Sequence, residues 1–424
     1  MTELSHHPSI LWPAQSDGTL LIGGTPLPLV AARLGTASFY AYDAERLRTR
    51  ILECRYAFGP EIHIHYAVKA NPFAPLVAAI ASWVDGFDVA SENEMALALD
   101  VGMPPERIAF ASPGKRPTAI RRAVAAGVTV TIESPDQLTT VLAAAEQLGV
   151  TPAVALRINP DFTMTRAGMK MGGGAQPFGV DREAAPALIA RIRASGAHWT
   201  GLHLFAGSQL LDTERLIAAH QNSYETLARL CDEAGAAPKW FNLGGGLGIP
   251  YFAGESPLDR AAVGAALHRL AQIHRQRFPT TQLILELGRY LVGEAGVFVT
   301  QILERKTSRG ETFLVCDAGL NAHLAATGNF GQVLKKNYPV AIGNRMNSPA
   351  TEKVTIVGPL CTPLDRLASN VLLPRAEAGD WVVVFQSGAY GTTASPQRFL
   401  SHPPVSETLV WPVTASKEPH HGTR

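Results

Sequence analysis

The sequence lacks the features that direct a chain to a membrane, to nucleic acid or to a disulfide-rich fold. Its four cysteines lie far apart and form no CxxC pair, which argues against a disulfide framework and against a zinc knuckle. Lys and Arg, 37 in total, nearly balance 36 Asp and Glu, and no basic block could follow a phosphate backbone. No apolar run approaches the roughly 18 residues of a membrane span, and the first residues lack a signal-peptide pattern. We therefore expect a cytoplasmic protein without nucleic-acid or membrane partners and without a metal site.

The composition also excludes disorder and collagen-like repetition. Hydrophobic residues make up 46% and charged residues 17% of the 424 residues, and the 38 Gly and 30 Pro are spread along the chain. A chain of this length can bury a substantial core. It predicts two or three domains, or one large barrel with a smaller unit.

Short, β-rich apolar runs alternate with Ala- and Leu-rich stretches between residues 60 and 290, which is typical of repeated βα units. Eight is the number of strands in a (β/α)8 barrel, and eight runs occur: Ile62–Val68, Val84–Val89, Arg107–Phe110, Val128–Ile132, Ala153–Ile158, Thr200–Phe205, Trp240–Leu243 and Leu283–Glu286. The stretches between them predict helices. Ser134, Pro135 and Asp136 indicate the start of one helix, and Gly149 indicates its end.

The pattern changes after about residue 295. Strand-like segments separated by turn-rich loops follow there with little helical periodicity: VFVTQILE, TFLVCD, KVTIVG, WVVVFQ and ETLVWPV. We expect residues 41–292 to form the barrel and residues 293–415 a mainly antiparallel β domain, to which residues 1–40 add N-terminal strands. The tail, residues 416–424, is expected to be disordered. The predicted fold class is thus α/β, a (β/α)8 barrel with a C-terminal β domain.

Polar residues follow the eight runs, at the carboxyl ends where such barrels place their catalytic groups. They are Lys69, Asp88 with Ser91, Ser112, Glu133, Arg157 with Asn159, His203 with Ser208, Gly244 to Gly246, and Glu286 with Arg289. We expect these residues to surround one site.

Three of these positions together favour a phosphorylated pyridine cofactor. A lysine that ends a buried strand, such as Lys69, is costly to bury as a cation, which favours an amine able to form a Schiff base; a lysine reaching out from the barrel rim is the alternative. Gly244–Gly246 can bring backbone N–H groups to a phosphate or can form a simple tight turn. Glu286 can hold a pyridine nitrogen protonated or can pair with Arg289, and His203 can stack on a ring or pack in the core. The combination favours pyridoxal phosphate.

Over nearly its whole length the chain resembles the fold type III pyridoxal-phosphate decarboxylases, which include ornithine and diaminopimelate decarboxylases. The resemblance lies in segments that follow one another in the family's order: HYAVKANP, GFDVASENE, LHLFAGSQ, NLGGGLGIPYF, ELGRYLVGEAG, VCDAGLN, GPLCTPLD and QSGAYG. It implies a barrel of the alanine-racemase type with a β domain, pyridoxal 5'-phosphate as cofactor and amino-acid decarboxylation as activity.

The resemblance also implies roles for single residues. Lys69 is similar to the Schiff-base lysine, His203 to the residue that stacks on the cofactor ring, and Glu286 to the partner of the pyridine nitrogen. Positions similar to those around the phosphate are Ser208, Gly244, Gly245, Gly246, Gly288, Arg289 and Tyr390, and positions similar to those near the lysine and the ring hydroxyl are Asp88 and Arg157.

Cys361 is similar to the catalytic cysteine that the family's second subunit donates, which implies a homodimer with shared active sites. Its surroundings, Gly358-Pro359 and Thr362-Pro363, are typical of an exposed loop, whereas the other cysteines are expected to be buried. Substrate contacts are implied for Cys361 and Tyr390, and expected for Thr362 and Asp365.

The expected reaction is loss of the α-carboxylate as CO2, with the ring nitrogen kept protonated by Glu286 and a proton returned to the α-carbon by Cys361 or Lys69. Related barrels include amino-acid racemases and non-catalytic pyridoxal-phosphate carriers, which remain alternatives. GPLCTPLD argues against a racemase. The predicted β domain argues against a carrier, which is a single barrel.

The substrate is where the chain departs from the best-known members. Diaminopimelate decarboxylases have a glutamate after the cysteine and an arginine in an RPxLY segment, and ornithine decarboxylases have an aspartate after the cysteine. Here Thr362 follows the cysteine, and HLAATGNFGQVLKKNYP has no arginine, although Asp365 remains available for a distal amine. The chain instead resembles the branch of the family that includes the glutamyl carrier-protein decarboxylase of butirosin biosynthesis. This resemblance lies in three segments: INPDFTMTRAGMKMGGGAQPFGVD, GPLCTPLD and SPQRFLSHP.

We therefore predict an acidic aminoacyl substrate, of glutamyl or aspartyl type, tethered by its side-chain carboxylate to an acyl carrier protein in secondary metabolism. A free amino acid such as diaminopimelate, lysine or ornithine is the alternative. The stretch MKMGGGAQPFG, with Lys170 and nearby Arg166, either borders the entry of the phosphopantetheine arm or is an ordinary loop.

Overall fold

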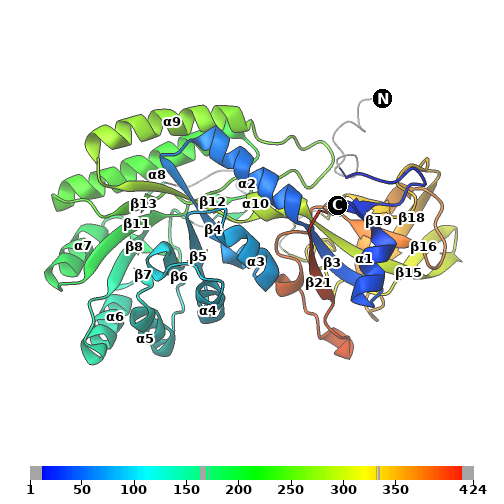
Figure 1. The fold of residues 1–424 in the computed structure, drawn as a ribbon, viewed down its shortest axis with the longest axis horizontal. Helices are drawn as coiled ribbons and strands as arrows, with labels where there is room; N and C mark the ends of the chain where they lie inside the picture. Colours follow the sequence, from blue (N-terminus) through cyan, green and yellow to red (C-terminus); the bar gives the residue numbers. More distant parts are fainter. Residues whose placement is uncertain (1–11, 163–168, 171, 331, 333–334, 413–424) are drawn as a thin grey trace, which may run out of the picture. The chain divides into compact units, whose positions relative to one another are not determined.

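The computed structural model describes residues 12–162, 169–170, 172–330, 332 and 335–412 (Figure 1). The predicted disordered tail, residues 416–424, lies outside the described residues, as do Arg166 and the side chain of Lys170. The chain divides into two compact units, one within Arg48–Gly293 and one within Met1–Leu47 and Glu294–Arg424.

Eight parallel strands close the first unit into a barrel (Figure 1). In order around the barrel they are β4 (Ile62–Ala67), β5 (Gly86–Val89), β6 (Ile108–Ala111), β7 (Thr129–Ile132), β8 (Ala153–Asn159), β11 (His198–Leu204), β13 (Trp240–Asn242) and β14 (Gln282–Leu287). β14 pairs with β4 and so completes the ring. Each strand matches one of the eight predicted runs to within two residues at either end. The predicted barrel is confirmed.

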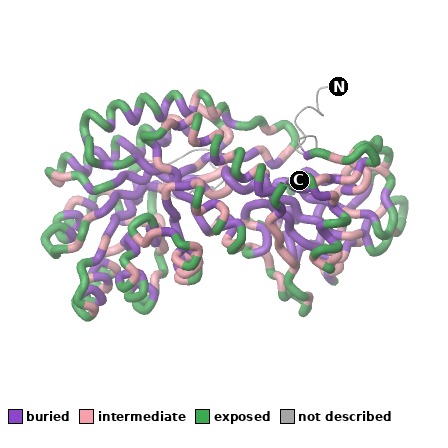
Figure 2. Tube along the Cα trace, viewed as in Figure 1, coloured by how far each residue is buried: buried purple, intermediate pink, exposed green. Residues whose placement is uncertain are grey.

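Several helices of this unit begin at a residue whose side chain caps the helix. The helices are α2 (Ala44–Phe58), α3 (Ala74–Ala81), α4 (Glu92–Asp100), α5 (Pro117–Ala126), α6 (Pro135–Leu148), α7 (Ala185–Ala194), α8 (Thr213–Ala234), α9 (Arg260–Arg277) and α10 (Arg289–Val292). At the start of α6, the Ser134 side chain accepts a hydrogen bond from the Gln137 N–H, and Gly149 ends the helix with a φ of 66°. Both ends of α6 were predicted. The strands are buried, whereas helices such as α8 and α9 bury one face and expose the other (Figure 2).

Large and small side chains fit together inside the barrel. Ala109, Ala155, Trp240 and Ile284 form one buried cluster from four strands. The Trp240 ring lies against Gly201, where a Cβ atom would come within 2.3–2.4 Å of the ring atoms. Gly201 is therefore required by close packing.

Gly201→Ala is expected to lower the melting temperature of the protein. The added methyl group overlaps the Trp240 ring, and overpacking of a core costs about 1–3 kcal/mol. Thermal unfolding followed by circular dichroism measures the effect. Gly114→Ala is the matched control, because no atom lies within 4 Å of where its Cβ would stand. Equal melting temperatures for the two variants would contradict this account of the interior.

The second unit is built on a mainly antiparallel sheet. Six strands run in the order β17 (Val340–Ile342), β20 (Trp381–Val384), β15 (Gly296–Ser308), β16 (Glu311–Cys316), β18 (Glu352–Val357) and β19 (Arg366–Leu373). β3 (Ser38–Asp43) pairs with both β15 and β21 (Ser406–Val410), so that segments from both ends of the chain join one sheet. The short strands β1 (Leu21–Ile22) and β2 (Thr25–Pro26) and the helix α1 (Leu27–Leu34) precede β3, and their apolar residues pack into the core of this unit.

Five strands of this sheet match predicted segments, but β17 and β19 do not. β17 has only three residues. β19 contains Asn370 with a positive φ of 52°, and its register against β18 is shifted, so its alternation is broken. β3 runs across residues 40 and 41, where the sequence placed the boundary between domains. Among the described helices, none is long and apolar enough to cross a membrane.

Candidate active site

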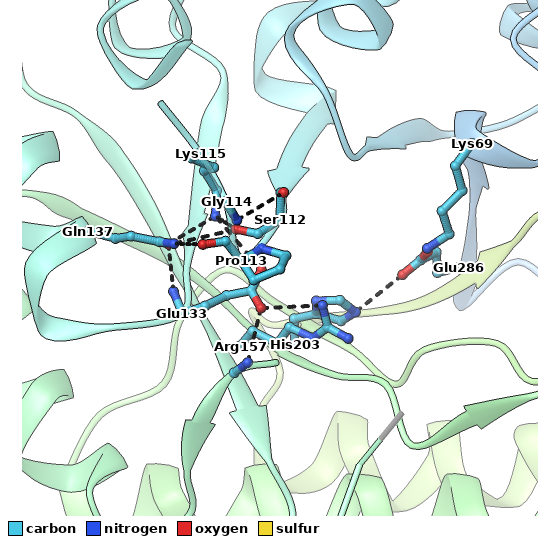
Figure 3. A network of polar contacts seen from close by, with 11 residues as sticks. Lys69, Ser112, Pro113, Gly114, Lys115, Glu133, Gln137, Arg157, His203 and Glu286 are labelled. Carbon is cyan, nitrogen blue, oxygen red and sulfur yellow. Dashed lines mark hydrogen bonds and ion pairs between the residues drawn. The ribbon is translucent and has the colours of Figure 1, made fainter. Parts of the chain in front are cut away.

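Lys69, Glu286 and His203 lie together at the carboxyl ends of their strands (Figure 3). Lys69 follows β4 in a short 3₁₀ turn, Val68–Ala70. Its Nζ donates a hydrogen bond to Glu286 Oε1 at 2.8 Å. His203 Nε2 lies 3.2 Å from Glu286 Oε2. These three side chains form the centre of the candidate site.

Glu286 is a buried carboxylate that is held in its charged form. Its side chain is 4% exposed, against 39% for Lys69. Burial alone would raise the pKa of Glu286, but the Lys69 ammonium and His203 outweigh burial and hold that pKa well below its usual value. The site therefore presents a carboxylate that is charged at neutral pH next to a partly exposed amine.

A second buried carboxylate, Asp88 at the end of β5, is held by two neighbours. His65 Nδ1 lies 3.3 Å from Asp88 Oδ2. The Asn242 side-chain amide donates to the same oxygen at 3.4 Å. Because Asn242 ends β13, which is not a neighbour of β5 in the ring, this hydrogen bond crosses the barrel interior. Asp88 is thereby fixed within the barrel.

Arg157, near the end of β8, is held by an anion and by an aromatic ring. Its Nη1 lies 3.5 Å from Glu133 Oε2, and its guanidinium lies over the Phe178 ring, 5.1 Å from the ring centroid. Arg157 pairs in register with His203 on β11. The structure thus brings Arg157 to the same end of the barrel as Glu286 (Figure 3).

The turn after β13 depends on its glycines. A Cβ atom at Gly245 would stand 1.9 Å from the carbonyl oxygen of Glu286. Gly244 and Gly246 have φ values of 73° and 83°, in the region that favours glycine. His220 Nε2 lies 2.8 Å from the Gly245 carbonyl oxygen, at hydrogen-bond distance. The turn is therefore packed tightly against the carboxyl end of β14.

The other predicted phosphate-site residues of the barrel unit have defined places. Ser208 lies in β12 (Gly207–Ser208), which pairs with β9 (Met169–Lys170). Gly288 directly precedes α10, and Arg289 begins that helix. The Arg289 guanidinium donates to the Tyr251 hydroxyl at 2.7 Å. Tyr251 comes from the chain that follows the glycine turn and thus connects the two segments.

The remaining predicted residues belong to the β unit. Cys361 is exposed, whereas Cys54, Cys231 and Cys316 are buried. The backbone of Thr362 donates to the Leu360 carbonyl at 2.8 Å in a tight turn. Tyr390 has a positive φ of 54°, and its ring centroid lies 6.5 Å from that of Phe330.

Asp365 anchors the loop that carries Cys361. Its Oδ1 accepts the Leu320 N–H at 2.6 Å, and its Oδ2 accepts the Leu360 N–H at 2.8 Å. Gly319 and Gly358 pack against the carboxylate so closely that neither place has room for a Cβ atom. Because only 2% of the residue is exposed, the carboxylate stabilises the loop through these hydrogen bonds. The predicted contact of Asp365 with substrate stays a prediction.

Sequence reasoning missed several residues that hold the predicted ones. His65 and Asn242 support Asp88, and Lys115 and Gln137 surround Glu133 (Figure 3). A signal for the first pair was present, because His65 is one of two histidines in β4 and Asn242 is the amide residue that ends β13. In the part of the chain that the structure describes, no group of three or more His, Cys, Asp or Glu residues could hold a metal ion.

Known protein families and relatives match this chain along most of its length. The model of the pyridoxal-binding domain of pyridoxal-dependent decarboxylases matches residues 44–293. The L-glutamyl-[BtrI acyl-carrier protein] decarboxylase of Niallia circulans is 36% identical over 377 residues, which cover 88% of each chain. A diaminopimelate decarboxylase of Archaeoglobus fulgidus is 32% identical over 410 residues, which cover 95% of each chain.

Solved structures are similar over both units. The diaminopimelate decarboxylase of Helicobacter pylori, complexed with L-lysine, matches with a TM-score of 0.79 and 26% identity, covering 90% of this chain and 94% of that chain. The diaminopimelate decarboxylase of M. jannaschii, also in complex with L-lysine, matches with a TM-score of 0.81 and 25% identity, covering 93% and 92%.

Glu286→Gln is expected to destabilise the cofactor-free protein in a pH-dependent manner. Because the folded state lowers the pKa of Glu286, the charged carboxylate stabilises the fold above its unfolded pKa of about 4.3 and loses this effect as the pH falls toward the folded pKa. The melting-temperature difference between wild type and variant should therefore be largest near neutral pH and should narrow below about pH 4. Exposed Glu146→Gln is the control. A gap that widens in acid would contradict the ionised state of Glu286.

Proposed function

The chain belongs to the pyridoxal-dependent decarboxylases, and we propose that it removes the α-carboxylate of an acidic aminoacyl group, of glutamyl or aspartyl type, tethered to an acyl carrier protein. The protein is a carboxy-lyase that uses pyridoxal 5'-phosphate. Which amino acid it takes depends on the distal end of the substrate, the end farthest from the α-carbon.

The observation that carries the proposal is the missing buried charge in the segments expected to meet that distal end. In HLAATGNFGQVLKKNYP, residues 323–339, no arginine occurs, and the two lysines, Lys335 and Lys336, are exposed. His323 is 0% exposed, and burial lowers its pKa to about 3, so it is neutral. In the loop of Cys361, the Asp365 carboxylate is bound to backbone N–H groups. A free distal carboxylate or ammonium needs a countercharge when it is desolvated. A thioester needs none.

The comparison with relatives supports the same substrate class. The Niallia circulans relative is named for a glutamyl group on an acyl carrier protein, and it shares more identical residues with this chain than the Archaeoglobus fulgidus relative does. We therefore propose a tethered acyl group for this protein as well, with the carrier protein as its partner.

The residues at the end of the barrel fit pyridoxal phosphate. His203 is a buried, planar imidazole at the end of the barrel, which suits a residue that packs on a flat ring. Glu286 is buried and charged, which suits a protonated ring nitrogen. Lys69 has a partly exposed amine that can bind an aldehyde covalently. The glycine turn after β13 allows the close approach of backbone to a phosphate.

When bound, the cofactor supplies an electron sink for the α-carbon. Lys69 would hold the cofactor and yield its place to the substrate amine. Glu286 would lie against the ring nitrogen as a buried carboxylate and favour its protonated form. Arg157 would contact the ring hydroxyl. Cys361 or Lys69 would return a proton to the α-carbon after CO2 has left.

We further propose that the protein is a homodimer in which Cys361 serves the site of the partner subunit. The exposed position of Cys361 on an anchored loop supports this role. An exposed thiol on a rigid loop can reach a second subunit, whereas the three buried thiols cannot.

Glutamyl or aspartyl groups loaded on the phosphopantetheine of a carrier protein should release CO2 with this enzyme. We expect their kcat/KM to exceed that of the free amino acids by at least about 100-fold, because the carrier contributes binding energy that is realised in the transition state. Labelled CO2 measures the rate, and Lys69→Ala is the inactive control. Efficient turnover of free lysine, ornithine or diaminopimelate, with none of the tethered groups, would refute this substrate and leave the decarboxylase intact.

Lys69→Ala and Cys361→Ala proteins, each inactive alone, should recover activity when they are mixed and allowed to exchange subunits. Half of the resulting dimers are hybrids with one intact site of two, so about a quarter of wild-type activity is expected. The CO2 assay measures the recovery. No recovery, despite subunit exchange shown by differently tagged chains, would count against shared sites.

A further inference from the structure

A buried lysine that the proposed chemistry does not use lies beside the site. The side chain of Lys115 is 0% exposed. Its Nζ donates to the Ser112 carbonyl at 2.6 Å and to Gln137 Oε1 at 3.0 Å. Burial lowers the pKa of Lys115 to about 8, although Glu133 acts in the opposite direction. Such a group requires a reason to be there, because an ammonium is costly to bury.

Glu133 lies between Lys115 and Arg157 (Figure 3). Its Oε1 is 3.8 Å from Lys115 Nζ and makes no hydrogen bond. Its Oε2 is 3.5 Å from Arg157 Nη1 and accepts the Gly179 N–H at 3.0 Å. The carboxylate is 2% exposed. One buried anion therefore serves two buried cations, one on each oxygen.

The simplest role for Lys115 would be to hold the loop that follows β6. Gln137 already does so with a neutral amide, which donates to the Ser112 and Pro113 carbonyls at 3.4 Å and 3.0 Å. A second group with the same task would not need a charge. Only a cation at this place can compensate part of the negative charge on Glu133.

We propose that Lys115 is a positioning residue for Arg157, and that it acts through Glu133. By attracting Oε1, Lys115 orients the carboxylate so that Arg157 meets it at one nitrogen, Nη1, and the guanidinium keeps its charge for the cofactor. Without Lys115, Glu133 is free to form a two-armed pair with Arg157, which draws the guanidinium toward β7. This inference rests on the proposed function in one respect, the contact of Arg157 with the cofactor.

Lys115→Met in the full-length protein is expected to weaken the binding of pyridoxal phosphate about tenfold, the size of one displaced contact to a charged group. Equilibrium dialysis of the cofactor gives the dissociation constant independently of turnover. Arg121→Met, which removes an exposed arginine from α5, is the control and should leave the affinity unchanged. An unchanged affinity in Lys115→Met would overturn the proposal.

A double-mutant cycle with Glu133→Gln tests the route of the effect. If Lys115 acts through Glu133, Lys115→Met changes the affinity by less than about twofold in the Glu133→Gln background. Equal losses in both backgrounds would reduce Lys115 to a loop contact and overturn the proposal. If Lys115→Met does not fold, Lys115→Gln replaces it in the same cycle and must give the same result. A wild-type protein that binds the cofactor but releases no CO2 from tethered groups refutes only the proposed function.

Discussion

The charge on Glu286 is the constraint on which the candidate site depends. A carboxylate this deeply buried stays ionised only if cationic or hydrogen-bonding partners stand next to it, and its partners come from β4 and β11, far from β14 in the sequence. Only the closed ring of strands brings them together. The parallel register matters as well, because a shift of β14 by one residue would turn Glu286 to the helix side of the barrel.

The same demand for partners explains the polarity of the barrel interior. The cluster around Trp240 and Ile284 is apolar and buried. Toward the carboxyl ends of the strands, each buried charge is shared: Asp88 between His65 and Asn242, and Glu133 between Lys115 and Arg157. Such a network holds its side chains in place before any ligand arrives, which is the basis of electrostatic preorganisation.

Much of the barrel could be predicted because buried parallel strands are short apolar runs, and because site residues in this fold follow them directly. Lys69, Glu286 and His203 were predicted as site residues in this way. The supporting residues could not be predicted from the strand pattern, because Lys115 meets Glu133, and Asn242 meets Asp88, only once the ring of strands closes. The Asp365 anchor likewise involves backbone N–H groups, which leave no pattern in the side chains. β17 and β19 escaped detection because one is too short and the other is interrupted at Asn370.

The pairing of β3 with β15 and β21 also sets the order in which the sheet of the β unit can form during synthesis. β3 is synthesised before the strands of the barrel, β15 directly after them and β21 last of the three. The barrel can therefore assemble while the nascent chain still grows, but one edge of β3 stays unpaired until β15 has emerged and the other until β21 has emerged. A truncation before β21 would leave a chain with all the strands of the barrel and an open edge at β3.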